Sequence, residues 1–205
     1  MATFTPYDQY EVAIPLEVAG DCLELLNKTV YGPDNLWQGF RTPGLLRFVA
    51  GEDFYVSMSN GGPRMYVNIE DYVTRSSGKP NDKFGKVIDL MLKQCRGRLH
   101  WGKAGWPTHQ QCFDGAASFP KTWCDFGCAV SQLDPAGKFR SESEVWRWNA
   151  TRGGAQVPLA SCCTAQGFSK GCECVSAACS QGPVSLAAPT PAPEVWIAAL
   201  TAAGR

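Results

Sequence analysis

The chain has 205 residues, a length that suits one domain or one domain with a tail. Its 19 basic and 19 acidic residues cancel, which argues against a nucleic-acid binder or a polybasic membrane binder. Hydrophobic residues make up 44% of the chain, which is enough apolar side chain for a folded core. No stretch reaches the roughly 18 apolar residues that cross a bilayer, and the start of the chain lacks the pattern of a signal peptide.

The first part of the chain predicts strands and a helix. Alternating apolar side chains predict a short half-buried strand over residues 10–14, in which Glu11 lies on the polar side. Apolar residues at helical spacing predict a helix over residues 15–30, although Asp21 and Glu24 could form a capping box that starts it later. Three further runs predict an antiparallel meander: residues 45–50, 54–58 and 65–72.

The remaining elements complete an α+β pattern. A continuous apolar stripe predicts a helix over residues 84–95, with Asn81 as its cap, and a second helix is predicted over residues 120–132. Residues 96–107 predict no regular structure. We expect a mixed or antiparallel sheet with helices packed on one face. The predicted division is a domain over residues 1–150, a cysteine-rich extension over 151–182 and a disordered Ala/Pro-rich tail over 183–205.

Ten cysteines bear on the redox compartment. Cys22 and Cys95 fall on apolar faces of predicted helices, so we expect free, buried thiols there. Five others crowd together, which favours disulfides and a secretory or luminal compartment: Cys162, Cys163, Cys172, Cys174 and Cys179. A zinc module is an alternative for this cluster, but the spacing is not C-x2-C and no histidine lies near. A separate alternative is that Cys112, with His109 nearby in the sequence, is a nucleophile, although no orienting partner is evident.

Three segments carry residues suited to chemistry. Arg47 sits inside an apolar strand, where its charge needs a carboxylate, a phosphate or an anionic ligand, unless it lies on a solvated face. Tyr66 and Asn68 alternate along one strand, so they share a face and offer a hydroxyl and an amide to one ligand. The run His100-Trp101-Gly102-Lys103 follows a helix and contains a lysine that could stabilise developing negative charge. Alternatively, Tyr66 and Asn68 lie on an ordinary exposed strand face, and residues 100–103 form a surface loop with a packing tryptophan.

Together with the run Leu133-Asp134-Pro135-Ala136-Gly137-Lys138-Phe139, these segments resemble the C-terminal part of the aldonolactone oxidases. This family includes L-gulonolactone and D-arabinono-1,4-lactone oxidases and belongs to the vanillyl-alcohol-oxidase group of flavoproteins. The resemblance covers residues 10–148. The cysteine-rich stretch is similar in kind to the tail of plant-type gulonolactone oxidases.

The resemblance implies a reaction and a set of roles. Such enzymes oxidise the carbon–hydroxyl next to the lactone carbonyl, pass hydride to N5 of FAD, and use O2 to give hydrogen peroxide and ascorbate or an analogue. It implies catalytic, flavin-contacting cations at Arg47 and Lys103, and substrate-binding side chains at Tyr66, Asn68 and His100. His100 and Trp101 would also line the pocket beside the flavin ring. Some members associate loosely with membranes, and no metal is implied.

Two departures from the family pattern stand out. Animal and bacterial members usually carry a glutamate two residues before the strand arginine, where this chain has Leu45. The sequence also lacks the glycine-rich pyrophosphate loop of the family's flavin domain. We therefore expect an incomplete enzyme that by itself binds FAD poorly and turns over weakly or not at all. The alternative is a non-catalytic, disulfide-stapled extracellular domain that binds sugar or protein, which the seven tryptophans would suit.

Overall fold

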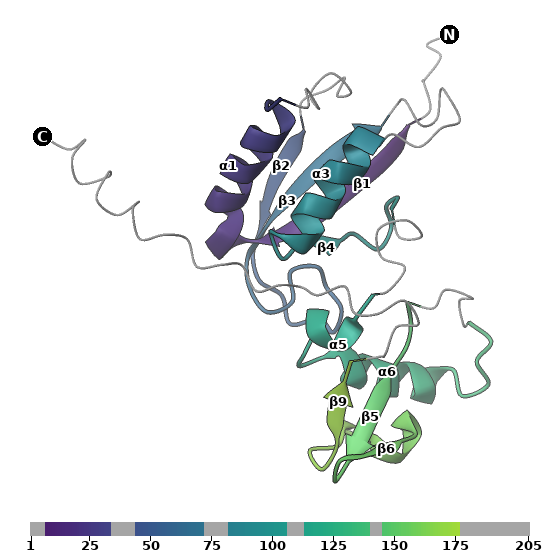
Figure 1. Cartoon of the computed structure of the whole chain (residues 1–205). Coiled ribbons are helices and arrows are strands. Elements are labelled where there is room, and N and C mark those ends of the chain that lie inside the picture. Colours follow the sequence, from purple (N-terminus) through teal and green to yellow (C-terminus); the bar gives the residue numbers. More distant parts are fainter. Residues whose placement is uncertain (1–6, 34–43, 72–81, 106–112, 140–144, 177–205) are drawn as a thin grey trace, which may run out of the picture.

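A four-stranded antiparallel sheet forms the first half of the chain (Figure 1). The computed structural model describes residues 7–33, 44–71, 82–105, 113–139 and 145–176. The strands, in spatial order β2-β3-β1-β4, are β1 (Asp8–Pro15), β2 (Leu45–Val49), β3 (Arg64–Asp71) and β4 (Arg98–Leu99). The strands predicted near β1, β2 and β3 are therefore confirmed, whereas β4 lies in a stretch for which the sequence predicts no regular structure.

Two helices cover one face of this sheet, as predicted (Figure 1). They are α1 (Ala19–Val30), entered through the 3-10 turn η1 (Leu16–Val18), and α3 (Asp82–Lys93). The capping-box alternative is wrong, because α1 begins at Ala19 without a side-chain cap. Val12 and Ile14 of β1 are fully buried under these helices and pack with Met65 of β3 and Met91 of α3. Burial of alternate β-branched and long apolar side chains holds the two layers together.

A disulfide joins the two helical segments. Cys22 of α1 bonds to Cys95, just beyond α3, across a Cα–Cα distance of 5.6 Å. The expectation of free thiols at these positions is wrong. Both side chains are almost fully buried, 3% and 2% exposed, so their apolar surroundings gave the signature of small hydrophobic residues. Apolar periodicity reports that a cysteine is buried, but not that another cysteine faces it.

The segment between β2 and β3 folds as turns, so the strand predicted over residues 54–58 is wrong. Asn60 donates its side-chain amide to the carbonyl of Phe54, and the Ser57 hydroxyl accepts from the backbone N–H of Ser59. Such local side-chain bonds compete with a strand ladder. The segment instead packs beneath the sheet, where Met58 contributes to a small cluster with Ala13 and Tyr66 on the face without helices.

The second half of the described chain is built around α6 (Trp123–Leu133) and a small antiparallel sheet of order β6-β5-β9 (Figure 1). The helix predicted over residues 120–132 is confirmed as α6, and the short α5 (Gly115–Ser118) precedes it. The sheet strands are β5 (Asn149–Arg152), β6 (Ala155–Val157) and β9 (Glu173–Val175). Between β6 and β9 lie η3 (Leu159–Cys162), β7 (Cys163–Thr164) and β8 (Gly167–Phe168). These strands are too short for alternation to reveal them.

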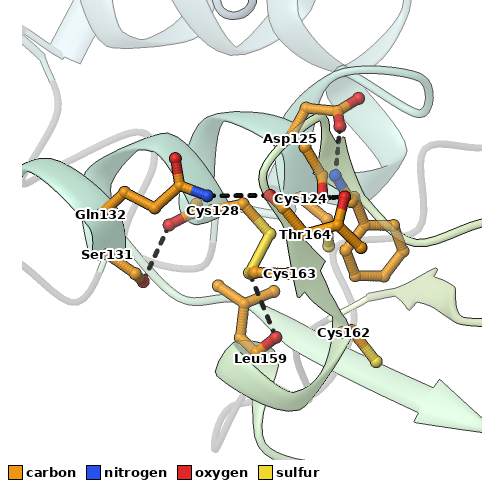
Figure 2. The surroundings of a disulfide bond; sticks show 12 residues. Cys124, Asp125, Cys128, Ser131, Gln132, Leu159, Cys162, Cys163 and Thr164 are labelled. Carbon is orange, nitrogen blue, oxygen red and sulfur yellow. Dashed lines mark hydrogen bonds between the residues drawn. A yellow bond between two sulfur atoms is a disulfide. The ribbon is translucent and has the colours of Figure 1, made fainter.

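Three disulfides crosslink this half of the chain. Cys124–Cys174 joins α6 to β9, Cys128–Cys163 joins α6 to β7, and Cys162–Cys172 joins the end of η3 to the residue before β9. Figure 2 shows the second of them, flanked by Gln132, whose amide donates to the Thr164 carbonyl at 2.9 Å. The predicted oxidation of the cysteine cluster is confirmed for these residues. The zinc alternative is wrong, because Cys162, Cys163, Cys172 and Cys174 carry no thiolate when they are bonded.

An aromatic seam joins the two halves. Trp101, from the segment after β4, stacks on Trp146 with ring centroids 4.8 Å apart. Arg98 of β4 lies over the Phe119 ring at 4.2 Å and donates to the carbonyl of Ser118, as well as to two carbonyls of the β2–β3 segment. The predicted tail over 183–205, Cys112 and His109 lie outside the described residues, and the predicted domain boundaries stay a prediction. Within the described ranges no helix is long and apolar enough to cross a membrane.

Candidate functional site

The face of the main sheet without helices carries polar side chains from three adjacent strands. The strand register places Arg47 of β2 and Ala13 of β1 on either side of Tyr66 of β3. Two residues along, Asn68 is flanked by Leu45 and Glu11 in the same way. Because alternate residues share a face, the predicted common face for Tyr66 and Asn68 is confirmed, and Arg47 joins them there. The Arg47 guanidinium lies 5.5 Å from the centroid of the Tyr66 ring.

Glu11 is the buried centre of this face. Its side chain is fully buried, and its Oε1 accepts a hydrogen bond from Arg47 Nη2. Arg47 itself is 51% exposed, so its guanidinium covers the carboxylate and still reaches solvent. The prediction that the strand arginine points at a partner is confirmed. Sequence reasoning did not identify Glu11 as that partner. The available signal was a glutamate inside a short apolar strand, where a charge requires compensation.

Gln9, two residues before Glu11 on β1, connects two more of the predicted side chains. Its Nε2 donates to Asn68 Oδ1 at 3.3 Å, and its Oε1 accepts from Lys103 Nζ. Gln9 and Glu11 therefore link residues of β3 and β2 on one side with the segment after β4 on the other. This follows from topology, because β1 lies between β3 and β4. Sequence reasoning missed Gln9 as well, since nothing in a lone polar residue of a strand indicates its partners.

His100 enters the site from the edge beyond β4. Its backbone N–H donates to the Glu11 carbonyl at 2.9 Å, and its Nδ1 accepts from the Gly102 N–H at 3.1 Å. Its Nε2 lies 3.8 Å from Glu11 Oε2. Burial lowers the pKa of His100 below its usual value; Glu11 opposes this shift, and Lys103 and Arg47 add to it. The imidazole is therefore neutral at neutral pH.

The two aromatic candidates lie at the covered end of the face. Tyr66 is 7% exposed, and its hydroxyl shares a 2.9 Å hydrogen bond with the Ser59 hydroxyl. Trp101 donates its indole N–H to the Val56 carbonyl at 2.9 Å and packs in the aromatic seam. Both side chains thus have packing roles. The substrate contact predicted for Tyr66 and the flavin contact predicted for Trp101 stay predictions.

The arrangement combines two cations, a buried carboxylate and a neutral imidazole on one surface. Arg47 and Lys103 can stabilise negative charge that develops on a bound molecule. The neutral His100 ring carries one N–H, and the Asn68 amide, which is 7% exposed and bonded to Gln9, adds a polar group beneath this face. In the part of the chain that the structure describes, no group of three or more His, Cys, Asp or Glu side chains could hold a metal ion.

Comparison with known proteins gives one result. No curated protein and no solved structure matches the chain. A family model described as D-arabinono-1,4-lactone oxidase matches residues 1–147, a span that contains every residue of the polar face. The resemblance drawn from the sequence motifs is confirmed, and membership indicates an oxidoreductase of the aldonolactone oxidase type. The chain belongs to the D-arabinono-1,4-lactone oxidase family.

Proposed function

We propose that this chain is the C-terminal substrate domain of an FAD-dependent oxidase of D-arabinono-1,4-lactone or L-gulono-1,4-lactone. The reaction consumes the lactone and O2 and yields an ascorbate-type product and hydrogen peroxide. The observation that supports it is the convergence of Arg47, Asn68, His100 and Lys103 on one helix-free sheet face through Glu11 and Gln9. The four converging residues come from three segments, β2, β3 and the stretch after β4, and β1 joins these segments through Gln9 and Glu11.

We expect the polar face to lie beside the ring end of a flavin. FAD, when bound, accepts the hydride and passes the electrons to O2. Arg47 is half exposed and Lys103 is partly exposed, and their positive charges suit the negative charge of a reduced flavin or of substrate oxygens. The sequence has no glycine-rich loop for the pyrophosphate, so that part of FAD would be held by a flavin domain outside this chain.

The same residues can orient a lactone. Arg47, which is half exposed, can hold a carbonyl or hydroxyl oxygen, and we expect the partly exposed His100 ring to border the bound lactone. Asn68 is buried and hydrogen-bonded to Gln9. Because His100 is neutral at neutral pH, it adds no third cation to the site. The Tyr66 ring under Arg47 limits where the guanidinium can move. Binding therefore depends on Arg47 more than on Tyr66, whose hydroxyl already has a partner.

The disulfides support a place for the protein in an oxidising compartment. Four bonds occur among the described residues, including three within the second half of the chain. Such density is typical of secreted or luminal proteins. We propose a secretory or luminal location, while any loose membrane association rests on the family resemblance.

The test measures lactone and flavin binding separately on the oxidised chain. L-Gulono- or D-arabinono-1,4-lactone is titrated while the imidazole proton signals of His100 are followed by NMR, and the absorbance of added FAD is recorded anaerobically. We expect lactone to shift His100 and FAD to bind weakly. Arg47→Met should weaken lactone binding by about tenfold, as expected for loss of a charged hydrogen-bond donor. Lys93→Met, in an exposed ion pair on α3, is the matched control. Equal affinity in Arg47→Met would contradict the proposal.

A second candidate function rests on a separate pocket. A cavity of about 780 Å³ opens beside α6, lined largely by apolar and aromatic side chains that include Phe126, Trp146 and Trp148. Aromatic walls of this kind suit the apolar face of a sugar ring. This favours the alternative of a non-catalytic, disulfide-stapled binding domain. Sugar binding that quenches tryptophan fluorescence without flavin, and that is lost in Trp148→Ala but kept in Arg47→Met, would support it.

A further inference from the structure

The ion pair with Arg47 engages only one of the two carboxylate oxygens of Glu11. Its side chain is fully buried, and Oε1 is bonded to Arg47. Oε2 is also buried but has no hydrogen-bond partner among the described residues. An unsatisfied carboxylate oxygen away from water is costly, so such an atom in a folded protein calls for an explanation.

The ring of His100 lies beside Oε2. Since Nδ1 of His100 accepts from the Gly102 N–H at 3.1 Å, the proton of the neutral ring is on Nε2. That nitrogen lies 3.8 Å from Glu11 Oε2, just beyond hydrogen-bond range. A small rotation of the ring would close this gap. The backbone already fixes the two residues together, because the His100 N–H donates to the Glu11 carbonyl.

The position of Glu11 also bears on the missing family glutamate, whose place is taken by Leu45. Leu45 and Glu11 flank Asn68 from opposite sides in the sheet register. Leu45 is 58% exposed on β2 and carries no charge, whereas Glu11 places a carboxylate beside the same strand arginine from β1. Being fully buried, Glu11 is hidden beneath the residues that a ligand would touch.

We propose that Glu11 is a positioning residue of this site, holding Arg47 through one carboxylate oxygen and His100 through the other. It thereby links Arg47 on β2 with His100 in the segment after β4. It also supplies a carboxylate that is absent at Leu45. This inference rests on the proposed function for its catalytic meaning, but the coupling itself is a property of the chain alone. Among the described residues, the charged groups that act on the His100 ring are Glu11, Lys103 and Arg47.

The experiment follows the titration of His100 in the full oxidised chain by NMR. The sequence has two histidines, so the His109→Gln variant assigns the signals. In Glu11→Gln, which keeps the shape and removes the charge, the pKa of His100 should fall further below its usual value. Glu17→Gln is the control, because Glu17 is an exposed glutamate paired with Arg96 and should leave the titration unchanged. An unchanged His100 pKa in folded Glu11→Gln would overturn the proposal.

A second variant covers the case in which Glu11→Gln does not fold. Arg47 is half exposed, so Arg47→Met changes the surface and leaves Glu11 available to His100. The pKa of His100 should then rise, opposite in sign to the first variant, and no rise would overturn the coupling. In the lactone titration, Glu11→Gln should bind about tenfold more weakly. Absence of lactone binding even to the unmodified chain would count against the proposed function, while the titrations would still decide the role of Glu11.

Discussion

Removal of the Cys22–Cys95 disulfide should destabilise the main sheet more than any other single bond of the described chain. The double variant Cys22→Ala/Cys95→Ala is the suitable perturbation, because both side chains are buried and alanine adds no polar group there. The bond joins α1 to the end of α3, the two helices that cover the sheet. Without it, the unfolded chain gains the freedom of the long segment between the cysteines.

The magnitude follows from that segment. The cysteines are 73 residues apart, and closing such a loop is worth about 4 kcal/mol in the chain-entropy description. A single domain is stable by roughly 5–15 kcal/mol in total, so this one bond accounts for a large share. For a chain of this size the loss corresponds to a fall in Tm of about 8–16 °C.

Thermal unfolding followed by far-ultraviolet circular dichroism measures the effect, because α1 and α3 dominate the helical signal of the sheet half. The control is Cys162→Ala/Cys172→Ala, whose cysteines are 10 residues apart and whose bond is worth about 3 kcal/mol by the same reasoning. We expect the first variant to lose more, and in the helical signal. A fall in Tm no larger than that of the control would refute the loop-entropy reasoning for this chain.

Three further predictions concern stability. Gly115→Ala should destabilise by about 1–3 kcal/mol in urea unfolding, because a Cβ would lie 1.9 Å from the Trp123 ring. Arg98→Met should cost about 3 kcal/mol and change tryptophan fluorescence, since the carbonyls that it joins across the aromatic seam would lose their donor. The lowered pKa of His100 predicts that stability falls as pH drops below about 6.5, because the unfolded state then binds the proton more readily; His100→Gln should remove this component in acid titrations of Tm.

A control variant for each of these three predictions defines the result that would contradict it. Gly20→Ala in α1 has open space at its Cβ and should stabilise by about 0.5–1 kcal/mol, so a loss there equal to that of Gly115→Ala would contradict the packing argument. Arg96→Met removes an exposed ion pair and should change little, in contrast to Arg98→Met. An acid dependence that persists in His100→Gln would assign it to other groups.

The sequence predicted the elements whose side chains follow a long, regular period. The apolar stripe of α3 and the alternation in β1 and β3 were sufficient, because burial on one face imposes the pattern directly. It failed for residues 54–58, where local bonds from Ser57 and Asn60 outweigh a β-type composition. It was also silent on β5, β6 and β9, which span too few residues to show a period.

The candidate site divides in the same way. Arg47, Asn68, His100 and Lys103 were recognisable by residue type and by motif, and the fold brings them to one face. Glu11 was not, although it is the centre of that face. A strand pattern states which side of a sheet a residue occupies, whereas its charge partner depends on which strands become neighbours.

The sequence by itself determined that helices cover one face of a sheet, that the cysteine cluster is oxidised, and which family the chain belongs to. The tertiary structure alone decided three things: that Cys22 faces Cys95, that Cys163 and Cys174 bond to cysteines of α6, and that Gln9 and Glu11 connect the site. Each of these is a contact between residues far apart in the chain. Such contacts are fixed when the sheet acquires the order β2-β3-β1-β4, and local periodicity carries no information about that order.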